Sequence, residues 1–170
     1  MTPAEEETIP MEGLFTLQIP EHLLHKLEWE YTQWQDEPLN SYRAWNFFVT
    51  AEHLPDWLAR SRPRLPKGFG IKAFKKDKPL LRICSHLASG GKHFTPNATH
   101  TSVTSTRREE GWVDEDWIEE DWVESDELMV DLTPKEQEAL QSPSASITAF
   151  SLATDVLAFW QQYFSGTSTP

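Results

Sequence analysis

The stretch SYRAWNFFVTAEHLPDWL, Ser41 to Leu58, decides the fold because it predicts one long buried helix. Its apolar residues recur three and four positions apart, which places side chains on one face of an α-helix. Asn40 or Ser41 offers a side-chain oxygen for the N-cap. Pro55 lacks a backbone donor, so we expect it to kink the helix or to restart it near Asp56. The stripe assigned to the core is Ala44, Phe47, Ala51, Leu54 and Leu58, widened by Trp45 and Phe48.

Three further segments carry the helical pattern. One begins at Pro20 and has an apolar face from Leu23 to Trp34, and another begins at Pro79 and continues through LLRICSHLA. The last places apolar residues from Ile147 to Tyr163 at helical spacing. A shorter helix starts at Thr133–Glu136, where Thr, Pro and a Glu three positions on match a capping box. The predicted common core is Phe47, Leu54, Leu58, Ile83, Leu87, Val156 and Phe159.

Two segments before the last helix predict a β-hairpin. TSVTSTR, residues 101–107, is rich in β-branched residues, and ELMVDL, residues 127–132, alternates apolar and polar side chains. Residues 109–127 then contain the connection between the strands. The expected fold class is α-rich (α+β): a bundle of about four helices with one β-hairpin inserted before the C-terminal helix.

Length and composition indicate one soluble domain. A chain of 170 residues can bury a core without disulfides, and its single cysteine, Cys84, has no partner for one. We expect a single domain over residues 14–164, with flexible ends at 1–13 and 165–170. The acidic start lacks the pattern of a signal peptide, and no apolar run has membrane-spanning length. The sequence therefore predicts a cytoplasmic protein that does not enter membranes.

The charge of the chain is concentrated in two blocks. The net charge is −12, and residues 109–127 contain eleven acidic residues and no basic one. Residues 60–82 contain nine Lys or Arg and one Asp. Such asymmetry predicts contacts driven by charge.

The acidic block repeats one phrase three times. GWVDEDWIEEDWVESD, residues 111–126, places three tryptophans five positions apart, a spacing that lines neither one helix face nor one strand face. One interpretation is an interaction segment, because indole rings supply contact area and carboxylates attract a basic partner. The other is a local repeat in a surface loop whose tryptophans pack on the domain itself. The predicted contact residues are Trp112, Asp116, Trp117, Glu120 and Trp122.

The basic block has two interpretations as well. It can bind phosphates or an acidic partner, including the protein's own residues 109–127, or it can be a solvated loop. Only Phe69 and Phe74 are aromatic there and no nucleic-acid motif is present, so nucleic acid is possible but not favoured. The candidate patch is Arg60, Arg62, Arg64, Lys72, Lys75 and Lys76.

Arg82, His86 and His93 form the most chemical group in the sequence. At positions i, i+4 and i+11 they share one face of a continuous helix. An imidazole as general base beside a cation that holds phosphate suits metal-free RNA cleavage. The alternative is that these side chains satisfy buried carbonyls and the edge of the aromatic core. We predict no metal site, because no third ligand is evident beside His22 and His25 or beside His86 and His93, and we predict no cofactor.

Two motifs resemble known families. YRAWNFFVTAEHLPDWL and LLRICSHLASGGKHF resemble a family of small uncharacterised bacterial proteins with NFFVTAxHLxDW-like and ICxxLANGxKHF-like helices, from which Ser89 departs. That resemblance implies this fold and no mechanism. The helical layout is also loosely similar to HEPN domains, which include metal-independent ribonucleases of toxin and anti-phage systems. Their motif is Arg, a polar residue, variable positions and His, whereas RICSH, residues 82–86, has Ile at the second position and is one residue short.

The sequence thus leads to two functional hypotheses. The first is a non-enzymatic interaction or accessory protein of bacterial or phage origin, which contacts a basic protein surface through the acidic Trp-rich segment. The alternative is a HEPN-like metal-independent ribonuclease or nucleotide-binding effector in defence or a toxin system, with Arg82, His86 and His93 as its catalytic residues.

Overall fold

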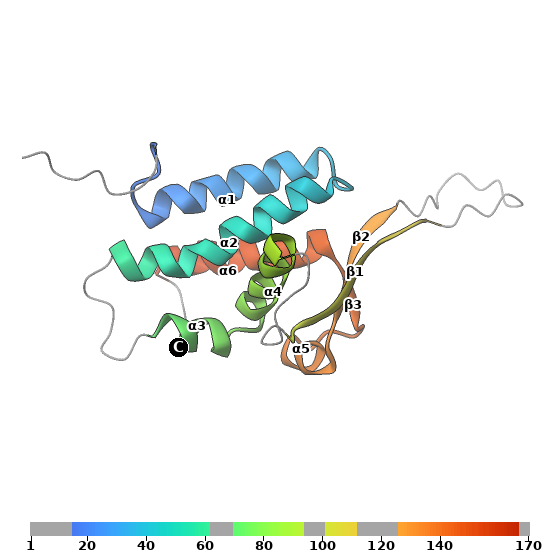
Figure 1. Ribbon diagram of the computed structural model, residues 1–170. Helices are drawn as coiled ribbons and strands as arrows, with labels where there is room; N and C mark the ends of the chain where they lie inside the picture. The colour runs from blue at the N-terminus through green and yellow to red at the C-terminus, as the bar shows by residue number, and fades with distance from the viewer. Residues whose placement is uncertain (1–14, 62–69, 94–100, 112–125, 167–170) are drawn as a thin grey trace, which may run out of the picture.

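The protein folds into a helical layer with a small antiparallel sheet at one side (Figure 1). The computed structural model describes residues 15–61, 70–93, 101–111 and 126–166. Its helices are α1 (Pro20–Gln35), α2 (Ser41–Ser61), α3 (Ile71–Asp77), α4 (Pro79–His93), α5 (Pro134–Ala139) and α6 (Ala149–Phe164), and its strands are β1 (Val103–Glu109), β2 (Glu127–Leu132) and β3 (Ser146–Thr148). The predicted α-rich fold with a hairpin before the C-terminal helix is confirmed.

Helix α2 forms as its sequence predicts, and it excludes one of the two alternatives for Pro55. The Asn40 side-chain oxygen accepts hydrogen bonds from the backbone N–H groups of Tyr42, at 3.0 Å, and Arg43, at 3.2 Å, so Asn40 is the cap. The helix does not restart near Asp56, because it continues through Pro55. Leu54 and Leu58 are fully buried around the proline, and this packing holds the helix together where one backbone hydrogen bond is lost.

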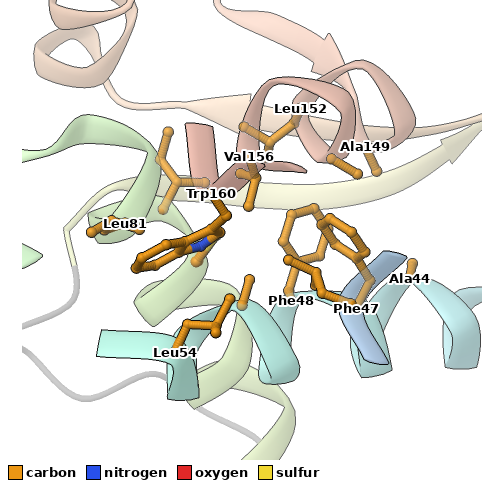
Figure 2. Close-up of a cluster of buried hydrophobic side chains, with 14 of the residues drawn as sticks. Ala44, Phe47, Phe48, Leu54, Leu81, Ala149, Leu152, Val156 and Trp160 are labelled. Carbon is orange, nitrogen blue, oxygen red and sulfur yellow. The ribbon is translucent and has the colours of Figure 1, made fainter. Parts of the chain in front are cut away.

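The core lies between α1, α2, α4, α6 and the base of the hairpin. In Figure 2, Trp160 of α6 extends toward Leu54 of α2 and Leu81 of α4. Leu87 and Phe159 are only half-buried and pack against the core from outside, because Trp160 takes the inner position on α6. The other five predicted core residues, Phe47, Leu54, Leu58, Ile83 and Val156, are fully buried.

The predicted hairpin is present and gains a third strand. β1 and β2 pair antiparallel from Val103 opposite Leu132 to Glu109 opposite Glu127, with an irregularity between Val103 and Ser105. β3 then pairs with the other side of β2, which gives the order β1-β2-β3. Ile147, which we expected in the last helix, lies in β3 instead.

The start of α6 explains that correction. The Thr148 hydroxyl accepts a hydrogen bond from the backbone N–H of Ser151 at 3.0 Å, so the helix is capped there and begins at Ala149. The helical spacing of the apolar residues could not reveal that Ile147 lies outside the helix, because its side chain packs against the core from the strand as well.

Helix α5 begins at Pro134 as predicted, but its capping box does not form. Thr133 makes no side-chain cap hydrogen bond, and its hydroxyl oxygen is buried with no partner among the described residues. The Glu136 carboxylate turns instead to Arg82 of α4. An ion pair with the partly buried Arg82 replaces the local bond, because a buried carboxylate needs a charged partner more than a helix end needs a second cap.

Candidate interaction site

Arg82 is the centre of a partly buried polar cluster. Its Nε and Nη2 donate to the two carboxylate oxygens of Glu136 at 2.7 and 2.6 Å, and its Nη1 donates to the carbonyl of Lys76. The Ser102 hydroxyl donates to the same carboxylate at 3.0 Å, and Glu136 is only 1% exposed. The hydrogen bond with Glu136 raises the pKa of Arg82 above its ordinary value. Arg82 therefore joins α4 to α5 and to the start of β1.

His86 is buried beside this cluster. Its Nδ1 accepts hydrogen bonds from the backbone N–H groups of Ser102 and Val103, both at 3.1 Å. A ring nitrogen that accepts carries no proton, so this bonding corresponds to neutral His86 with its proton on Nε2. His86 thus has a structural role, but it satisfies backbone N–H groups, whereas the structural alternative expected it to satisfy buried carbonyls. The side chain of His93 lies outside the described part of the structure.

The three candidate catalytic residues are therefore not shown as one open site. Arg82 and His86 are linked through Ser102, whose hydroxyl contacts Glu136 and whose N–H contacts His86. Cys84 is fully buried, and burial raises the pKa of its thiol, so a reactive thiolate is disfavoured there. Among the described residues, no three His, Cys, Asp or Glu side chains gather as metal ligands do.

Some of the described residues of the basic block pair with other elements of the fold, and others are exposed at the surface. Lys75 Nζ donates to Glu52 at 2.7 Å and to Asp56 at 3.3 Å, and this pairing ties α3 to α2. Ser85 of α4 donates to Glu52 as well, at 3.2 Å. Arg62 and Arg64 lie outside the described residues, and the exposed members of the predicted patch are Arg60, Lys72 and Lys76.

The base of the acidic segment is held by an ion pair. Arg108 pairs with Asp126, and the backbone N–H of Gly111 donates to the other oxygen of Asp126 at 3.1 Å. The hydrogen bond from Arg108 lowers the pKa of Asp126. These contacts bring together the two ends of residues 112–125, which lie outside the described part and include all five predicted contact residues.

A groove of about 750 Å³ lies between the β1–β2 pair, the first half of α2 and the end of α4. The exposed ring of Trp45 and the buried ring of Phe48 form part of its wall, and His86 lines it from α4. Arg107 and Arg108 are the only charged residues among the described ones that line it. The sequence patterns did not predict this groove, because its walls come from α2, α4, β1, β2 and the start of α6, which are far apart in the sequence.

Sequence reasoning also missed the partners of the predicted residues. Glu136 and Glu52 bind the partly buried cations Arg82 and Lys75, yet Glu136 was assigned to a helix cap and Glu52 to no role. The sequence offered one indication of these partners, which is that acidic residues occur within apolar helical stripes. Such residues need a buried partner, but the pattern does not name it.

The comparisons with known proteins found no match: no family model, curated protein or solved structure is similar to the chain. The two resemblances drawn from sequence motifs therefore stay predictions. Within the described ranges, none of the helices is long and apolar enough to cross a membrane.

Proposed function

We propose that this protein is a non-enzymatic interaction protein that presents the acidic Trp-rich segment on a β-hairpin arm to a basic surface of another protein. The observation that carries the proposal is the arrangement at the arm's end. β1 and β2 remain paired up to Glu109 and Glu127, and Asp126 binds both Arg108 and the Gly111 N–H. The segment 112–125 is thus attached to the fold at two adjacent points.

The composition of the attached segment supports contact with a basic partner. Residues 112–125 contain seven acidic residues, no basic one and three tryptophans. Carboxylates speed encounter with a positive surface, and buried indole rings supply most of the binding energy at such interfaces.

Contact with the protein's own basic block has less support. In Figure 1 the open end of the hairpin and α3 lie at opposite sides of the molecule. Lys75 and Arg82 in that block already pair with Glu52 and Glu136. An external basic partner accounts for the acidic segment without displacing either pair.

The ribonuclease alternative gains no support from the described residues. Arg82 is bound at both ends of its guanidinium, and His86 Nδ1 is occupied by two backbone donors. These contacts give both side chains a structural role in the fold.

The test compares the full chain with two variants of the arm. One replaces Trp112, Trp117 and Trp122 by Ala, and the other replaces residues 112–125 by Asn-Gly, a sequence that closes short hairpins. We expect both variants to stay folded. In quantitative affinity capture from cell extract, the full chain should retain a set of basic proteins, and both variants should lose that same set. Release of those proteins at high salt is expected from screening. As a control, Lys72→Ala changes an exposed charge elsewhere and should capture the same set.

Equal capture by the full chain and both arm variants would overturn the proposal. If the Trp variant does not fold, the three rings belong to the core instead. Circular dichroism shows whether each variant is folded.

A further inference from the structure

His86 is a titratable side chain in the interior of the fold. It is 7% exposed, and its Nδ1 accepts hydrogen bonds from the backbone N–H groups of Ser102 and Val103. These two bonds, which we call the His86 contact, join α4 to the start of β1. Because a ring nitrogen that accepts hydrogen bonds carries no proton, the His86 contact requires the neutral imidazole.

Protonation is incompatible with the His86 contact. Both ring nitrogens of a charged imidazole are donors, so no orientation of the ring offers an acceptor to the two backbone groups. In place, the charged ring would direct its Nδ1–H group at two other N–H groups. A buried N–H group without an acceptor costs free energy, so the ring and the start of β1 have to separate.

The cations near His86 oppose a further positive charge. Arg82 lies four positions earlier on α4, and Arg107 and Arg108 line the same groove as His86. Each of these arginines pairs with a carboxylate, which reduces its effect on the imidazole. The other described residues that line the groove, from α2, β2 and α6, carry no charge.

The described carboxylates on the elements packed around α4 already have cationic partners. Glu136 of α5, which the Ser102 hydroxyl contacts, pairs with Arg82, and Glu52 of α2 pairs with Lys75 of α3. Neither carboxylate is printed in contact with the imidazole by a shared hydrogen bond. Burial and the two accepted hydrogen bonds are therefore the main influences on the ring, and both favour its neutral form.

The groove gives solvent a route to the His86 contact. Both His86 and Val103 line it. A proton can therefore reach this region without unfolding of the helices. A free imidazole titrates near pH 6.5, so the contact can respond to mild acid, in which most Asp and Glu side chains stay ionised.

We propose that the His86 contact is a pH-sensitive switch, which holds the start of β1 on α4 while the imidazole is neutral and releases it when the imidazole is protonated. The Ser102 carbonyl and hydroxyl remain bound to the Thr133 N–H and to Glu136, so the release is local. The hairpin is then attached to α4 less firmly in mild acid. This switch does not depend on what the arm binds.

The pH range follows from which state binds the proton more readily. Protonation is disfavoured in the closed state, whereas the released imidazole has the ordinary pKa of about 6.5. The closed state is therefore fully favoured above about pH 6.5. Below that pH the released state gains relative to the closed one, by up to about tenfold per pH unit.

The test measures amide hydrogen exchange by NMR in the full chain, with each rate divided by its intrinsic rate at the same pH. We expect the protection of the Ser102 and Val103 amides to fall about tenfold between about pH 7.5 and about pH 5.5. In His86→Asn the fall should be less than about twofold, because the Asn oxygen, bound to Cγ as Nδ1 is, accepts hydrogen bonds and does not titrate. His25→Asn, the same change at an exposed histidine of α1, should behave as wild type.

Two results would overturn the proposal. These are constant protection of both amides in wild type, and an equal fall in wild type and His86→Asn. Should His86→Asn fail to fold, the ring of His86 in the wild-type chain is titrated by NMR instead. A midpoint at or above about pH 6.5 would then overturn the proposal, whereas a lower midpoint together with the fall in protection would support it.

Discussion

Breaking the Arg82–Glu136 pair should destabilise the fold strongly, whereas replacing both partners should cost little. Arg82→Met leaves the Glu136 carboxylate, 1% exposed, with only the Ser102 hydroxyl as a partner. Removing one member of a buried pair typically costs about 3–5 kcal/mol. Arg82 is 17% exposed in its side chain, so water can reach the vacated space and we expect the lower end, about 3 kcal/mol. Glu136→Leu should cost a similar amount, because it strands the guanidinium.

The double variant Arg82→Met, Glu136→Leu separates charge pairing from packing. It removes both charges and fills the space with apolar groups, so its stability should lie within about 1 kcal/mol of wild type. Urea unfolding followed by far-ultraviolet circular dichroism measures all four proteins, and equal m-values make the comparison valid. A loss below about 1 kcal/mol for Arg82→Met, or additive losses in the double variant, would refute the reasoning.

The remaining predictions concern the core, the sheet and the histidine. Leu54→Ala should lower the free energy of unfolding by about 2–5 kcal/mol because Leu54 is fully buried; a loss under about half a kcal/mol in urea unfolding would contradict the assigned helix face. Hydrogen bonds from Arg107, Ser105 and Ser146 hold the pKa of Asp131 well below its ordinary 3.8. Ionised Asp131 therefore stabilises the fold above about pH 3.8, and this stabilisation is lost as the pH falls from there toward the lowered pKa. Asp131→Asn should therefore be less stable than wild type at neutral pH, and thermal unfolding should show the difference shrinking below about pH 4; a constant difference down to acidic pH would argue against the ion pair. His86→Ala should cost about 2–4 kcal/mol, because two buried N–H groups lose their acceptor, and wild type should not cleave RNA without metal. Cleavage by wild type that His86→Ala abolishes at unchanged stability would instead support the ribonuclease alternative.

Local sequence patterns determined most of the secondary structure. The buried face of α2 and the capping by Asn40 depend on residues within a few positions of one another, and so do the paired segments of the hairpin. Periodicity of three to four or of two residues encodes such features directly. The exceptions lie at element ends, where Ile147 fits a helix pattern and a strand equally well.

Only the tertiary structure decided what the polar residues do. Arg82 and Glu136 are 54 positions apart, and His86 meets the N–H of Val103 across 17 positions. A sequence shows that a charge or an imidazole sits in an apolar stripe and needs a partner, but many partners satisfy that need equally well. The choice depends on how α4, α5 and β1 pack together, and the same packing creates the groove along β1. Helices and strands follow from contacts between near neighbours, whereas ion pairs and grooves follow from contacts that form only after those elements assemble.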